Sequence, residues 1–142
     1  MYTTEPEYNL NQIHDSQWSA VSPIYGISSS LRKAQRKVAE LSRLPENWDT
    51  YGSTSIQSPA IEMALKILFL VDRQGVAVPQ IFPVSGGGIQ LEWQSERREL
   101  EIEILPNGML EYLIVDEQMN MQEGALPAHE EFNIYNLIKW VR

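Results

Sequence analysis

Two stretches of the sequence, Ile89-Gln90-Leu91-Glu92-Trp93 and Leu100-Glu101-Ile102-Glu103-Ile104, alternate strictly between apolar and polar side chains. Successive side chains of a β-strand point to opposite faces of the sheet, so this period of two predicts a pair of strands with one apolar and one polar face. The apolar face needs cover from other elements. We therefore expect helices to pack on one side of this sheet.

Two further strands are predicted beside this pair. Gln80–Val84 reads as an edge strand, because Pro79 and Pro83 cannot donate to a ladder of backbone hydrogen bonds. The triple glycine at 86–88 supplies the next turn. Pro106-Asn107-Gly108 is a strong hairpin signal, and a strand over residues 109–115 follows it. The product is an antiparallel β-meander of four strands, with residues 124–127 read as a loop.

Three helices are predicted around the meander. The first, 29–44, starts at Ser29 or Ser30 as N-cap and carries apolar residues at spacings of three and four. The second, 58–75, has Ser58 as cap and Pro59 at its first position. Its apolar stripe is widened so far by Ile67, Phe69 and Leu70 that this helix should be central. The third, 128–142, is apolar enough to dock firmly or to form an oligomer interface. The fold class is α+β, with two N-terminal helices, the meander and a C-terminal helix.

Length and composition indicate one domain. A chain of 142 residues with 43% hydrophobic and 21% charged residues can build a single core. Residues 1–28 are polar without clear periodicity, so we interpret them as a flexible or docking N-terminal arm. Residues 29–142 form the single α+β domain.

Several classes of site are disfavoured by the residue types present. The chain has no cysteine, which leaves His14 and His129 as the only nitrogen ligands for a metal, and these are far apart in sequence. We predict no cofactor, no metal and no catalytic residues. The chain starts with acidic residues and has no apolar run of bilayer length, so we expect a cytoplasmic protein without a membrane partner.

The charge of the chain is unevenly distributed. The net charge of −8 argues against nucleic-acid binding, because a phosphate backbone is bound chiefly through Lys and Arg. One basic face is nevertheless expected on the first helix. It carries Arg32, Lys33, Arg36 and Lys37.

Glutamates gather on the polar face of the predicted sheet. The residues are Glu92, Glu101, Glu103 and Glu111, which three neighbouring strands would hold within reach of one another. One interpretation is a solvated face whose like charges oppose aggregation, and the other is a binding surface for a basic partner protein. Paired carboxylates also serve glycoside hydrolysis or divalent-ion binding, but those roles need a cleft that a flat sheet does not offer.

A loop with two aromatic residues joins the first two helices. Asp49 is expected to accept bonds from backbone amides ahead of it in an Asx-turn, and Gly52 to adopt a positive φ. Trp48 is expected to fill the space between helix and sheet, and Tyr51 to pack as well. We interpret these four residues as a structural loop first and as a ligand site second.

Four segments resemble, in order, a group of small uncharacterised bacterial proteins. They are Asn47-Trp48-Asp49-Thr50-Tyr51-Gly52, Ser58-Pro59-Ala60-Ile61, Gly87-Gly88-Ile89-Gln90-Leu91-Glu92-Trp93 and Leu100-Glu101-Ile102-Glu103-Ile104. In that group a WDxxG loop precedes a helix and a strand of the pattern GGIxLEW. The resemblance covers residues 44–115 and implies no established activity. Small reading frames of this kind are found in paired or mobile gene arrangements. The resemblance therefore implies, by analogy only, an antitoxin-like role in which the protein neutralises a partner.

These observations favour a non-enzymatic, protein-binding adaptor or regulator. Its surfaces would be the acidic sheet face, the last helix or the arm. Two alternatives stay open. One is an antitoxin-like or nucleic-acid-associated regulator that uses the basic helix, and the other is an unrecognised hydrolase.

Overall fold

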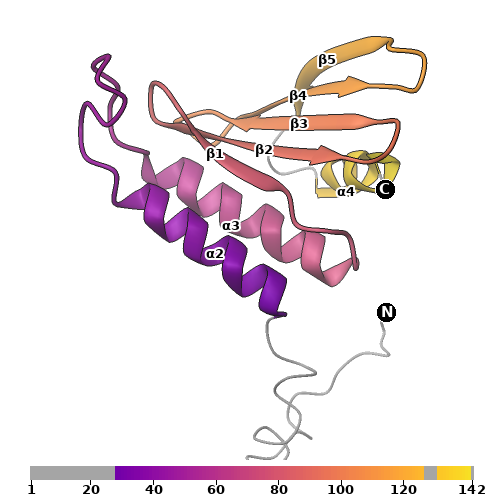
Figure 1. Cartoon of the computed structure of the whole chain (residues 1–142), viewed down its shortest axis with the longest axis horizontal. Helices are drawn as coiled ribbons and strands as arrows, with labels where there is room; N and C mark the ends of the chain where they lie inside the picture. The colour runs from indigo at the N-terminus through magenta and orange to yellow at the C-terminus, as the bar shows by residue number, and fades with distance from the viewer. Residues whose placement is uncertain (1–27, 127–130, 142) are drawn as a thin grey trace, which may run out of the picture.

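The structure, a computed structural model, describes residues 28–126 and 131–141. These residues form helices on one side of a sheet, so the chain builds two layers (Figure 1). The predicted arm lies outside the described residues, apart from Ser28. The elements are α2 (Ser29–Ser42), α3 (Ser58–Arg73), β1 (Gln80–Val84), β2 (Gly88–Gln94), β3 (Glu99–Ile104), β4 (Leu110–Val115), β5 (Met121–Leu126) and α4 (Glu131–Val141).

The α+β class is confirmed, but the number of strands is corrected. The described sheet has five antiparallel strands in the order β1-β2-β3-β4-β5, where four were predicted. The strand that the sequence did not indicate is β5, because Gly124 and Pro127 are typical of a loop. Its backbone pairs with β4, and Gly124 lies opposite Tyr112. A Cβ on Gly124 would come within 3.0 Å of the Tyr112 ring, so the aromatic side chain occupies the space that the glycine leaves.

The predicted apolar face is confirmed as the inner face of the sheet. Cross-strand register places Ile89 opposite Ile104 and Leu91 opposite Ile102, so apolar side chains form rows across the strands. The helices cover these rows from below (Figure 1). The six residues of the predicted face are all buried: Ile89, Leu91, Trp93, Leu100, Ile102 and Ile104.

Helix α2 begins at Ser29, and its cap lies before the predicted Ser29 or Ser30. Ser28 is the N-cap, and its Oγ accepts a hydrogen bond of 3.0 Å from the backbone N–H of Leu31. The same hydroxyl donates to a carboxylate oxygen of Asp72 at 2.6 Å, which ties the start of α2 to the end of α3. The helix ends at Ser42, two residues before the predicted end.

Helix α3 lies at the surface on one side, which corrects the prediction for Phe69. Ile67 and Leu68 are buried, but Phe69 is 51% exposed. Each residue turns the helix by about 100°, so three successive apolar residues cannot all face the core. The cap is Gln57 rather than Ser58, so Pro59 lies at the second helical position instead of the predicted first.

Helix α4 docks on the core through Ile134, Ile138 and Val141, all of which are buried. Arg98 reinforces this contact, since its Nη1 donates to the backbone oxygen of Trp140 at 2.5 Å and its guanidinium lies 5.0 Å from the indole centroid. Oligomerisation through this helix stays a prediction. None of the helices in the described part of the chain is long and apolar enough to cross a membrane.

Candidate functional site

The outer face of the sheet gathers the predicted glutamates. Glu92 lies directly opposite Glu101 on the neighbouring strand, and Glu103 lies directly opposite Glu111. Residues facing each other across antiparallel strands have Cβ atoms about 4.5–5.5 Å apart, and like charges in such pairs destabilise a sheet. The structure therefore brings all four predicted residues together on one surface, which we call the acidic face.

Two further glutamates extend the acidic face. Glu99 lies at the start of β3 on the same side as Glu101, and Glu123 of β5 follows Leu113 and Glu101 in the same cross-strand row. Sequence reasoning missed Glu99 because the strand was predicted to start at Leu100. It missed Glu123 because β5 was not predicted. The period of two, extended back by one residue, indicates Glu99, but no local signal indicates Glu123.

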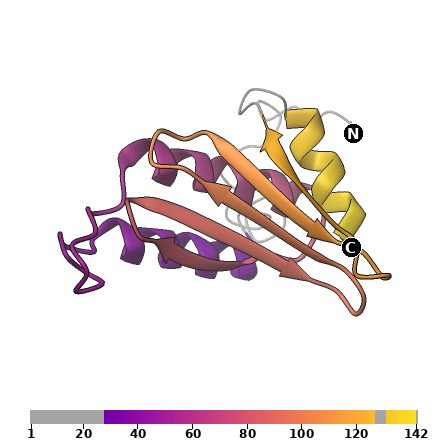
Figure 2. The ribbon, with the colours of Figure 1, turned by 90° about the horizontal axis from the view of Figure 1, so that it is seen from above.

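The acidic face has no balancing cation within its own strands. None of the residues of β1 to β5 is Lys or Arg. Seen from above, the strands lie in front of the helices, and no described element crosses over them (Figure 2). As far as the described residues show, the face is therefore uncovered and of one charge sign.

Partial burial raises the pKa of Glu101 above its usual value, and neighbouring carboxylates add to the rise. Those carboxylates belong to Glu92, Glu99 and Glu103. A carboxylate that is crowded in this way is stabilised when a cation approaches. The acidic face thus has a physical preference for a positively charged ligand group.

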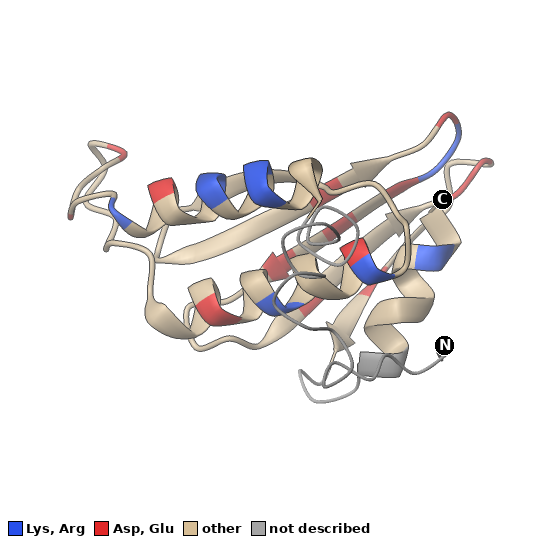
Figure 3. Cartoon of the chain, turned by 90° about the horizontal axis from the view of Figure 1, so that it is seen from below, with Lys and Arg blue, Asp and Glu red and all other residues tan. Residues whose placement is uncertain are grey.

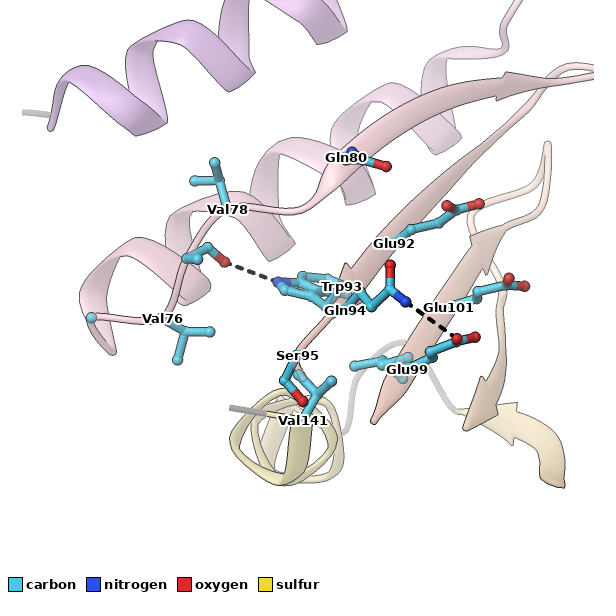
Figure 4. A pocket seen from close by; sticks show the side chains of 13 residues that line it. Val76, Val78, Gln80, Glu92, Trp93, Gln94, Ser95, Glu99, Glu101 and Val141 are labelled. Carbon is cyan, nitrogen blue, oxygen red and sulfur yellow. Dashed lines mark hydrogen bonds between the residues drawn. The ribbon is translucent and has the colours of Figure 1, made fainter. Parts of the chain in front are cut away.

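Two open hollows indent this side of the molecule. One, of about 450 Å³, lies over β3, β4 and β5 and is lined by Glu101, Glu103, Glu111 and Glu123 beside Leu113. The other, of about 610 Å³, lies at the end of β2 and the start of β3, beside the link from α3 to β1 and the end of α4 (Figure 4). Both hollows combine carboxylates with apolar side chains, as a site for a long basic side chain would.

Two polar groups in the second hollow, the Trp93 indole and the Gln94 amide, are already paired. The indole N–H of Trp93 donates to the backbone oxygen of Ala77 at 3.0 Å, and the Gln94 amide donates to Glu99 at 3.4 Å (Figure 4). Trp93 is 6% exposed and forms a fixed wall. The hollow offers carboxylates for charge recognition, but its lining includes no Cys, His or Lys.

The loop between α2 and α3 is held by a dense set of hydrogen bonds. Asp49 accepts from the backbone N–H groups of Tyr51 (2.9 Å) and Ser53 (3.2 Å), which confirms the predicted Asx-turn. The bond from the Tyr51 amide is the main cause that lowers the pKa of Asp49. Ser85 donates to the same carboxylate at 3.0 Å, so the loop is fastened to the β1–β2 turn.

The backbone of this loop has unusual conformations. Gly52 has a φ of 86°, as predicted, but Asn47 and Thr50 also have positive φ, of 62° and 65°. A β-branched residue such as Thr50 rarely adopts this region. The buried side chain of Ser53 helps to hold this backbone in place, because its Oγ accepts a hydrogen bond of 2.8 Å from the backbone N–H of Gly86. The loop and the glycine turn therefore form one rigid unit.

The two aromatic side chains of the loop do not take the predicted places. Tyr51 is 90% exposed, so the expectation that it packs is wrong. Trp48 is half-buried and lies outside the core cluster, where its indole N–H donates to the backbone oxygen of Thr54 at 3.2 Å. Local hydrogen bonds hold this loop in place, and neither aromatic ring belongs to the core cluster.

The predicted basic face is present on α2. Arg32, Lys33, Arg36 and Lys37 are all exposed, and basic residues mark the outside of this helix in the view from below (Figure 3). This surface belongs to the helix layer, on the other side of the sheet from the acidic face (Figure 1). The structure does not bring the two charged surfaces together within one molecule.

Metal-ligand geometry is absent from the described part of the chain, where no group of three His, Cys, Asp or Glu could hold an ion. His14 and His129 lie outside the described residues. The prediction of no metal and no cofactor therefore stays a prediction.

Comparisons with protein-family models, with curated proteins and with solved structures found no match. The resemblance to small bacterial proteins with a WDxxG loop thus stays a hypothesis. The function has to be inferred from the surfaces themselves.

Proposed function

We propose that this protein is a non-enzymatic adaptor or regulator that binds a basic partner protein on the acidic face. The observation that carries the proposal is the direct cross-strand pairing of Glu92 with Glu101 and of Glu103 with Glu111. A sheet that only needed solubility could alternate acidic and basic residues, because opposite charges in facing positions stabilise it. Here the like-charge pairs lower stability, and a bound cation would relieve their repulsion.

The geometry also supports a protein rather than a small ligand. The six glutamates span β2 to β5, and the two hollows beside them are open to solvent. Small-molecule sites bury most of their ligand in a concave, mostly apolar pocket. A broad acidic surface instead favours fast, salt-sensitive association with a positively charged surface.

The antitoxin-like or nucleic-acid-associated alternative has weaker support. It relies on the four basic residues of α2, which stand against a net charge of −8. The hydrolase alternative has little support, because the hydroxyl–carboxylate pairs of Ser28 with Asp72 and of Ser85 with Asp49 tie elements of the fold together. We therefore place the partner-binding function on the sheet.

The test compares the wild type with a variant carrying Glu92→Lys, Glu101→Lys and Glu103→Lys in affinity capture from the source cell's lysate. A matched control carries Glu40→Lys, Glu62→Lys and Glu96→Lys, which change the same charge at exposed positions off the acidic face. Circular dichroism and thermal unfolding confirm that both variants fold.

We expect wild type and control to retain a common protein that the sheet variant loses. The captured protein is then purified, and its affinity for each form is measured by titration calorimetry at two salt concentrations. The expected result is an affinity that falls with salt and falls further in the sheet variant. Equal affinity of the sheet variant and the control would contradict the proposal and return the glutamates to a solubility role.

A further inference from the structure

The helix layer carries a groove that no described residue fills. It has a volume of about 610 Å³ and runs between the first half of α2 and the start of β1. One wall consists of Ser30, Lys33, Ala34 and Lys37 of α2, and the other of residues 78–82. An apolar floor with a basic rim is suited to a segment that is apolar and acidic.

The lysines of this groove have no ionic partner among the residues that the structure describes. Lys33 and Lys37 are one helical turn apart on the same side of α2, and both are exposed. Two like charges at this spacing repel each other slightly. An acidic occupant would therefore gain both attraction and relief of this repulsion.

The edge of β1 restricts how an occupant can bind. Pro79 and Pro83 lie on either side of Ile81, and neither has an N–H to donate. A strand added to this edge would find few donors, so β-augmentation is poorly supported. Side-chain burial and charge pairing must supply the binding.

We propose that the occupant is the N-terminal arm of the same chain, residues 1–27. The arm contains no Lys or Arg but three acidic residues, Glu5, Glu7 and Asp15. Its apolar residues Trp18, Val21, Ile24 and Tyr25 suit the floor of the groove. The charge of the arm is thus opposite to that of the groove rim.

The connection of the chain supports an intramolecular contact. The arm ends next to Ser28, which is fixed by its bonds to Leu31 and Asp72, and Ser30 already lines the groove. The α2 wall from Ser30 to Lys37 is about 10 Å long, while 27 residues can span about 90 Å. The arm is long enough to reach the whole groove, and the tether gives it a high effective concentration there.

The test uses the full chain, which has no cysteine and therefore accepts a single label. A nitroxide on Ser22→Cys should broaden the backbone amide signals of Ala34, Lys37 and Ile81 in the NMR spectrum of the labelled protein. The Lys33→Glu, Lys37→Glu variant should lose most of this broadening. The matched control, Arg36→Glu with Arg43→Glu, makes the same charge change outside the groove wall and should retain it.

Three results would overturn the proposal. Broadening on the acidic face instead of the groove, or none at all, would show that the arm lies elsewhere. Broadening that persists in the Lys33→Glu, Lys37→Glu variant would show that charge pairing with these lysines does not hold the arm in the groove. Broadening that appears only between a spin-labelled molecule and a separate ¹⁵N-labelled one would assign the groove to the arm of a second copy.

Discussion

The two faces of the sheet are built from alternate residues of the same strands, β2 and β3, yet they behave in opposite ways. The inner face carries Ile, Leu and Trp under a cover of helices, while the outer face carries glutamates without cover. Burial of apolar area stabilises the first, and like-charge repulsion opposes the second. The comparison indicates that the inner face maintains the fold and that the outer face is available for binding.

The largest difference is expected between two adjacent residues of β3. Ile102 is fully buried, so Ile102→Ala should lower the free energy of unfolding by about 2–5 kcal/mol through lost burial and a new cavity. Glu103→Ala on the other face should change it by less than about 0.5 kcal/mol. Urea unfolding measures both. Similar values would mean that the outer face contributes to the fold as much as the inner face does.

A smaller loss of stability is expected from adding a side chain at Gly88, where the neighbouring backbone leaves no room for one. A Cβ on Gly88 would clash with the backbone oxygen of Ile104, so Gly88→Ala should lower the free energy of unfolding by about 1–3 kcal/mol. Gln90→Ala, the next residue on that face, is the control and should be nearly neutral. If the two variants unfold alike in urea, backbone adjustment absorbs the contact.

Removing one of the negative charges that crowd together on the acidic face should stabilise the protein. Glu101→Gln abolishes repulsion with Glu92 opposite, so the free energy of unfolding at pH 7 should rise by about 0.2–1 kcal/mol, towards the lower end because the side chain is partly exposed. Thermal unfolding across a range of pH measures this gain.

The sign of the pH dependence follows from the raised pKa of Glu101. The folded state holds this proton more tightly than the unfolded state, so the carboxyl lowers stability only above the unfolded pKa, near 4.5. The gain from Glu101→Gln should therefore fade as the pH falls below that value. A gain that persists at lower pH would show that charge is not its cause.

The smallest effect is expected from salt. Raising the salt concentration from 0.1 M to 1 M shortens the screening length from about 10 Å to about 3 Å, which weakens repulsion across the acidic face. The thermal midpoint of the wild type should rise slightly, and that of a Glu92→Gln, Glu101→Gln, Glu103→Gln variant should rise less. An equal rise of the thermal midpoint with salt in the two proteins would mean that the glutamates do not repel one another appreciably.

The candidate site could be predicted from the sequence only as far as local periodicity extends. Glu92, Glu101 and Glu103 are placed on one face by alternation alone, and Glu111 by the hairpin that precedes it. Glu123 required knowledge that β5 pairs with β4, which no local pattern indicates. The exposure of Tyr51 was also missed, because an aromatic residue in a loop does not reveal whether hydrogen bonds or burial hold that loop.

The sequence by itself determined the two-faced strands, the helix stripes and the segregation of charge along the chain. These properties follow from the fixed period of two or 3.6 residues per repeat, which is local. Only the tertiary structure decided which glutamates face each other, where β5 lies and which lysines line a groove. Those relations join residues far apart in the chain, and they depend on cross-strand register and on helix packing against the sheet.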